Sequence, residues 1–164
     1  MFARYFIELP IEADRVEQAL LRSPRDWIPG FAGEANHKGD VLLSEVGFGE
    51  DVRVARQVAI TFGQPVRTSS KLVLPLRWVA TGVTGFFPAL EADLEVAPLA
   101  ADSTQLAMSA RYVPPLGPIG KAIDRAVLFR VAEATLKDFL DRVGVVLLTD
   151  ALADGARGVA KVAD

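Results

Sequence analysis

Residues 104–120 read TQLAMSARYVPPLGPIG. Apolar and polar side chains alternate in the first half of this segment, which predicts a strand over residues 104–112. The prolines that follow remove backbone donors, so they predict a stiff connector that cannot join a sheet. Beyond the connector, apolar residues recur at helical spacing and predict a helix from about residue 120 to at least 143, with an extension to 152 left open. The apolar stripe of this helix comprises Phe129, Ala132, Leu136, Phe139, Leu140 and Val143.

The chain before this segment predicts further strands separated by turn residues, as in an antiparallel meander. We expect strands near residues 3–9, 41–46, 52–61, 71–80 and 89–96. A short helix is predicted over 13–21, and the aromatic residues in 26–31 indicate a loop or helical turn that plugs one end of the core. Together the elements predict an α+β domain, in which a curved antiparallel sheet wraps around the long C-terminal helix and one or two short helices follow the first strand.

Length and composition narrow the class of protein. The 164 residues, 17.6 kDa, fit one domain, which we assign to residues 1–145, followed by a helix extension and a frayed tail over 146–164. Cysteine is absent, which excludes disulfides, thiolate metal sites and cysteine nucleophiles and agrees with a reducing compartment. The net charge of −3 argues against a nucleic-acid-binding role. Without an export signal or an apolar run of about 20 residues, we expect a cytoplasmic protein without stable membrane insertion.

Strand periodicity predicts which residues line the space between sheet and helix, because alternate side chains share one face. The expected inward residues are Leu72, Leu74, Leu76, Trp78, Leu90, Ala92, Leu94, Val96, Leu106, Met108, Ala110 and Tyr112. The opposite face is polar, and we expect it to be solvated and to hold cross-strand charge pairs. Glu91, Asp93 and Glu95 on that face have an alternative interpretation as an acid/base or metal cluster, although alternate acidic residues on a strand normally just face water.

Arg56 is the most informative charged residue. Regular alternation places it on the face of Val54, Val58 and Ile60, where a guanidinium needs a carboxylate or a ligand's acidic group as partner. A bulge that turns Arg56 outward is an equal alternative. Arg125 extends the helical stripe toward the connector; it either collects an anionic group at the mouth of a cavity or, as the favoured interpretation, extends to solvent.

Familiar catalytic patterns are missing from the sequence. His37 is the single histidine and lies in a polar, glycine-bounded segment, so a zinc site and a catalytic triad are both improbable. No Gly-x-Ser-x-Gly elbow or phosphate-binding loop occurs. We therefore expect no cofactor and no metal.

The element order and two local strings resemble the START/SRPBCC superfamily, which includes the birch-pollen-allergen and polyketide cyclase families. The first string runs from Leu94 to Leu99, through residues 104–106, to the Tyr-Val-Pro-Pro corner at 112–115; the second is Ile11 to Val16 after the opening strand. The resemblance covers roughly residues 2–145 and implies the helix-grip fold. Most members hold hydrophobic ligands, and others are transporters, cyclases, hydrolases or regulators, so the resemblance implies fold far better than function.

Our first hypothesis for the function is binding of a small hydrophobic or amphipathic ligand, such as a lipid or polyketide, between the sheet and the C-terminal helix. The predicted ligand-binding residues are Arg56, Leu74, Leu76, Trp78, Leu94, Met108, Tyr112, Arg125, Phe129 and Leu136. The alternatives are an enzyme similar to a polyketide cyclase or dehydrase, and a regulatory or toxin-like interaction module that uses the apolar segment 145–152. We expect a monomer or a homodimer.

Overall fold

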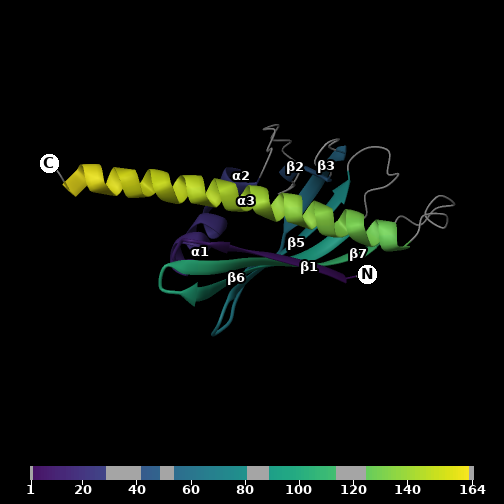
Figure 1. Cartoon of the computed structure of the whole chain (residues 1–164), viewed down its shortest axis with the longest axis horizontal. Helices are drawn as coiled ribbons and strands as arrows, with labels where there is room; N and C mark the ends of the chain where they lie inside the picture. The colour runs from purple at the N-terminus through teal and green to yellow at the C-terminus, as the bar shows by residue number, and fades with distance from the viewer. Residues whose placement is uncertain (1, 29–41, 49–53, 81–88, 114–124, 163–164) are drawn as a thin grey trace.

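A computed structural model describes residues 2–28, 42–48, 54–80, 89–113 and 125–162. In chain order, the elements are β1 (Phe2–Leu9), α1 (Ala13–Arg22), α2 (Pro24–Trp27), β2 (Leu42–Phe48), β3 (Val54–Phe62), β4 (Val66–Arg67), β5 (Leu72–Ala80), β6 (Ala89–Ala100), β7 (Ser103–Val113) and α3 (Arg125–Val162). Figure 1 shows the curved sheet on one side of α3, with the C-terminal end of the helix extending past the sheet. The predicted α+β architecture is confirmed.

The strands form one antiparallel sheet in the order β1-β7-β6-β5-β3-β2. On the side of β5 away from β6, β3 pairs with one half of the strand and β4 with the other. Pro75 lies between the part of β5 that pairs with β3 and the part that pairs with β4. The sheet therefore needs no backbone N–H from Pro75 at this position. Its carbonyl oxygen accepts a hydrogen bond from the Gly63 N–H at 2.8 Å.

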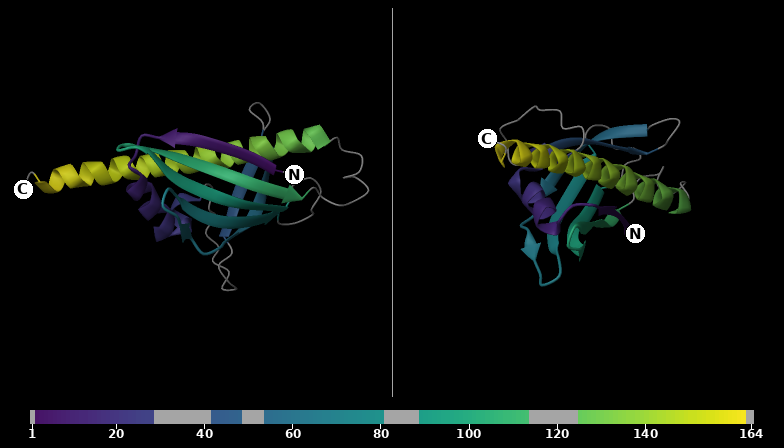
Figure 2. Two further views of the ribbon diagram at one scale, coloured as in Figure 1. Left: turned by 90° about the horizontal axis from the view of Figure 1, so that it is seen from below. Right: turned by 60° about the vertical axis from the view of Figure 1, so that its left-hand side comes forward.

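The helix α3 crosses the concave side of the sheet and contacts both outermost strands, β1 and β2. Figure 2 shows this arrangement from two further directions. At Gly144, α3 packs closely on β1, because a Cβ atom at this position would lie 2.5 Å from Ile7 Cδ1. The curved sheet therefore contacts α3 at both of its edges, and the hydrophobic core lies between the sheet and α3.

The helix–sheet core has the composition that strand periodicity predicts. Every residue expected on the inward faces of β5, β6 and β7 is buried, and the polar residues that alternate with them are exposed or half-buried. Along α3, Ala132, Leu136, Phe139, Leu140 and Val143 are buried, as the helical stripe predicts. Trp27 is buried in the helical turn α2 and contacts Phe62 edge-on, which agrees with a plug at one end of the core.

Three features differ from the sequence expectations. The strand β6 continues to Ala100, and the two-residue strand β4 was not predicted, since so short a segment shows no periodicity. The helix α3 continues to Val162, through the segment for which we expected a frayed end. Alanine at positions 151, 153, 156 and 160 supplies high helix propensity that offsets the glycines at 155 and 158. The proline connector and the segment around His37 lie outside the described residues.

Candidate functional site

The concave face of the sheet is built from rows of side chains that the strand register places side by side. One row runs Ile60, Trp78, Leu90, Tyr112, the next Leu76, Ala92, Ala110, Ala3, and the third Leu74, Leu94, Met108, Tyr5. The middle row holds three small side chains between two rows of large ones. We call Ala3, Ala92 and Ala110 the alanine trough. All three side chains are buried, so the groups that pack above them come from outside the sheet.

In the structure, side chains of α3 lie over this face. Leu136 and Phe139 have no exposed surface, and Phe139 makes an edge-to-face contact with Trp78, with 5.3 Å between ring centroids and an interplanar angle of 69°. Met108 and Leu94 are likewise fully buried. This face is therefore apolar, contains aromatic rings and is covered by α3.

Tyr112 brings a polar group into this apolar face. Its side chain is buried, and burial, with a smaller contribution from the negative charge of Glu133, raises the pKa of its hydroxyl above the ordinary value of 10.0. The phenol therefore stays protonated over the physiological pH range, and a protonated phenol can donate one hydrogen bond. A carbonyl or carboxylate of a bound molecule is the acceptor that such a donor suits.

Most of the predicted ligand-binding residues come together on this surface. Leu74, Leu76, Trp78, Leu94, Met108, Tyr112 and Leu136 are buried in it, and the half-buried Phe129 packs against the same core. Arg56 lies in β3 opposite Val46 of β2, and Arg125 begins α3, but both side chains lie outside the described residues. Their roles remain predictions.

The sequence interpretation missed two parts of the site. Phe139 was assigned to the helical stripe but not to the binding residues, because its contact with Trp78 depends on where the helix lies over the sheet. The alanine trough was missed because its members come from three strands and meet only through the register. Alanine spacing within one strand gives no signal for it.

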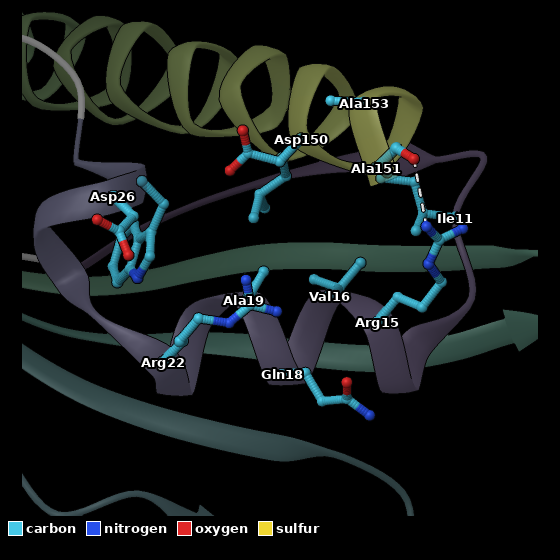
Figure 3. A pocket seen from close by; sticks show the side chains of 12 residues that line it. Ile11, Arg15, Val16, Gln18, Ala19, Arg22, Asp26, Asp150, Ala151 and Ala153 are labelled. Atoms are coloured by element: carbon cyan, nitrogen blue, oxygen red, sulfur yellow. Dashed lines mark hydrogen bonds between the residues drawn. The ribbon is translucent and has the colours of Figure 1, made fainter. Parts of the chain in front are cut away.

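A second concave region, a groove of about 400 Å³, lies between α1, α2 and the C-terminal half of α3 (Figure 3). Its apolar lining includes Ile11, Val16, Ala19, Trp27 and Leu147, and Arg15, Gln18, Arg22, Asp26 and Asp150 add polar groups. Arg15 Nη2 donates to the carbonyl oxygen of Ala151 at 3.2 Å, which ties α1 to α3. Charges of both signs line the groove, so it favours no anion or cation. In the sequence, the helical spacing of residues 15, 18 and 22 places these polar side chains on one face of α1, which is the one feature that indicates this groove.

One of the three acidic residues on the outer sheet face, Glu95, takes part in a surface charge network. Glu95 accepts a hydrogen bond from Lys71 Nζ at 2.8 Å and pairs with Arg4 at 3.6 Å, across the strands. The predicted cross-strand charge pairs are thus present. Among the described residues, no group of three or more acidic or histidine side chains is placed to hold a metal ion.

Comparisons with solved structures show the class of fold. The chain is similar to a conserved protein from Geobacillus kaustophilus, with a TM-score of 0.61, 18% identity and coverage of 91% of this chain and 96% of that one. A protein from Thermus thermophilus gives a TM-score of 0.55 at 12% identity, covering 92% and 99%. A START superfamily protein from Mycobacterium smegmatis gives 0.50 at 14% identity, covering 91% and 95%.

The chain therefore has a START-like fold, as its resemblance to that superfamily implied. At these identities the likeness shows the fold alone. No model of a known protein family and no curated protein matches the sequence. None of the helices in the described parts of the chain is long and apolar enough to cross a membrane.

Proposed function

We propose that the protein binds a small hydrophobic or amphipathic molecule, such as a lipid or a polyketide, between the concave face of the sheet and α3. The observation that supports this most directly is the alanine trough between two rows of large apolar side chains, with the Tyr112 hydroxyl at its side. The side chains of the trough are short, so a flat or flexible apolar body fits there once a helix side chain above it has moved, and the phenol offers a donor for one polar end. In this proposal the protein acts in the cytoplasm as a carrier or a sequestering protein.

Binding requires side chains of α3 to move. Leu136 and Phe139 cover the concave face, so a molecule that occupies the trough must displace at least one of them. The contact between Phe139 and Trp78 is then the first to change, because both rings lie on the covered face. This rearrangement makes Trp78 an internal reporter for binding.

Arg56 remains the proposed anchor for an acidic head group. The proposal rests on strand alternation, which places position 56 on the face of the buried Val58 and Ile60. A guanidinium there pairs with a carboxylate or phosphate of the ligand. Replacing Arg56 with alanine should weaken the binding of acidic ligands and leave the affinity for neutral ligands of the same size unchanged.

A catalytic role, like that of polyketide cyclases, is the second candidate. The observation that favours it is the buried Tyr112, whose raised pKa keeps the phenol neutral and able to polarise a ligand carbonyl through a hydrogen bond. A cyclase would release a product that differs in structure from the molecule it bound. A binding protein would return the same molecule unchanged.

The test is native mass spectrometry of gently purified protein, followed by solvent extraction and mass analysis of the released material. We expect a stoichiometric small molecule on the wild type and a loss of most of it in Ala92→Leu, which fills the trough. The control is Asp93→Leu, which adds a leucine at the neighbouring, exposed position on the outer face. Equal ligand content in both variants would place the molecule outside the trough and contradict the proposal.

A further inference from the structure

The groove between α1, α2 and α3 in Figure 3, which we call the α1–α3 groove, has the size of a small-molecule site. Its volume of about 400 Å³ lies within the range of roughly 300–1,000 Å³ that ligand pockets occupy. Its apolar lining consists of the buried Ile11, Val16, Trp27 and Leu147 and the half-buried Ala19. None of the residues that line it belongs to the three rows of the concave sheet face. The groove is therefore separate from the alanine trough.

Three charged side chains in this groove have no ion-pair partner in the described part of the chain. Arg22 belongs to α1, Asp26 to α2 and Asp150 to α3, and all three are exposed. The ion pairs between described residues are all made by other side chains. Arg15 differs from these three, because its Nη2 donates to the carbonyl oxygen of Ala151. Arg22 and the two carboxylates can therefore meet charges of a bound molecule.

The positive and negative groups lie on different sides of the groove. Figure 3 shows the guanidinium of Arg22 beside Ala19, on the α1 side, and the carboxylate of Asp150 on the α3 side. A guanidinium binds a carboxylate through paired N–H donors, and a carboxylate accepts hydrogen bonds from an ammonium. A molecule that carries both charges is attracted at both sides, whereas a molecule with one charge is attracted at one side and repelled at the other.

We propose that the α1–α3 groove binds an α-amino acid with an apolar side chain. The carboxylate of the amino acid faces Arg22, its ammonium faces Asp150, and its side chain contacts the apolar lining around Trp27 and Leu147. This occupant matches the balanced charge of the groove, its apolar lining and its volume. Ion pairs at exposed positions contribute little each, so we expect a dissociation constant in the millimolar range.

The two tryptophans of the chain report on the two proposed sites separately. Trp27 lines the α1–α3 groove, and Trp78 lies on the sheet face that α3 covers. Their indole N–H signals in a proton–nitrogen correlation NMR spectrum are assigned with Trp27→Phe and Trp78→Phe. Leucine and phenylalanine are then added to the wild type at up to about 20 mM. We expect a saturable shift of the Trp27 signal with at least one of them, while the Trp78 signal stays in place.

Analogues that lack one charge test how the amino acid is recognised. Isocaproate and isopentylamine are leucine without its ammonium and without its carboxylate, and phenylpropionate and phenethylamine are the same analogues of phenylalanine. Each should bind at least about threefold more weakly than its parent amino acid. Arg22→Gln should weaken the amino acid by a similar factor and should not weaken the amines. The control is Arg111→Gln, which removes an exposed arginine of β7 outside the groove and should leave the affinity unchanged.

Further variants separate this site from the proposed function. Ala92→Leu fills the alanine trough and should leave the amino-acid shift of Trp27 unchanged, and Arg22→Gln should leave a molecule in the trough bound. The proposal would be overturned by the absence of a saturable Trp27 shift with both amino acids, or by equal affinity for an amino acid and its single-charge analogues. Equal affinities of Arg22→Gln and Arg111→Gln for the amino acid would also contradict it.

Discussion

Tyr112 is the residue whose chemistry the buried face changes most clearly. Because burial raises its pKa in the folded protein above the 10.0 of an exposed tyrosine, the folded state holds this proton more tightly than the unfolded state. The stabilisation is complete below pH 10 and is lost as the pH rises through the folded-state pKa. Tyr112→Phe removes the titrating hydroxyl and therefore also removes this loss of stability at high pH.

We therefore predict that the free energy of unfolding of the wild type falls relative to that of Tyr112→Phe as the pH rises from 9 to 11. Urea denaturation at a series of pH values measures this difference. Tyr5→Phe removes the other tyrosine hydroxyl, which donates to Asp141 at 3.3 Å at a half-buried position, and serves as the control. Parallel pH profiles for the wild type and Tyr112→Phe would contradict the assignment.

Glu17 gives a second prediction at the scale of the residue. Its side chain is only 8% exposed, and Arg67 Nη2 lies 2.5 Å from its Oε2. Arg67→Ala leaves a buried carboxylate without its cation, and we expect a loss of about 1–2 kcal/mol in the free energy of unfolding, moderated because solvent reaches the exposed side of the pair. Thermal and urea denaturation measure it. Arg67→Lys should recover more than half of this loss in the free energy of unfolding. If Arg67→Ala is as stable as the wild type, the ion pair contributes nothing to stability.

At the scale of the element, the packing of α3 on β1 depends on Gly144. Glycine in a helix interior ordinarily lowers stability relative to alanine, but here a Cβ atom would meet Ile7 Cδ1 at 2.5 Å and Leu9 Cδ2 at 3.3 Å. We predict that Gly144→Leu lowers the free energy of unfolding by about 2–3 kcal/mol or more, through overpacking against β1.

Chemical denaturation of Gly144→Leu tests this packing directly. Val145→Leu, at the next position on the exposed side, is the control and should keep the stability within about 0.5 kcal/mol of the wild type. A Gly144→Leu protein as stable as the wild type would mean that α3 does not lie as close to β1 as the structure places it.

The elements themselves were largely predictable from the sequence. Burial alternates regularly along β5, β6 and β7, with Ala107 as an exception in β7, because one face packs on α3 and the other is largely exposed or half-buried. The sequence pattern alone therefore assigns Leu74, Leu94 and Met108 to the inward face. The C-terminal limit of α3 could not be predicted, since glycines at 155 and 158 read as a frayed end. Local propensity alone did not reveal the helix beyond Leu152.

At the scale of the whole molecule, the sequence predicted which side chains face inward but not how they meet. The alanine trough exists only because the register brings Ala3, Ala92 and Ala110 of three strands into one row. The contact between Trp78 and Phe139 exists only because α3 lies over the neighbouring row, which holds Trp78. Both depend on contacts distant in sequence, which no local pattern contains. The site therefore had to be read from the tertiary structure.

Binding in the trough is the central claim, and Trp78 fluorescence tests it most directly. Trp27→Phe leaves Trp78 as the only tryptophan, at the cost of the hydrogen bond from Trp27 Nε1 to the Leu20 carbonyl oxygen. This variant is titrated with oleate and with 1-anilinonaphthalene-8-sulfonate, which represent a flexible and an aromatic amphipathic ligand. We predict a saturable 1:1 change in Trp78 fluorescence with at least one of them, weakened at least about tenfold when Ala92→Leu is added and retained with Asp93→Leu. No saturable change with either molecule, or equal binding in both added variants, would contradict the account.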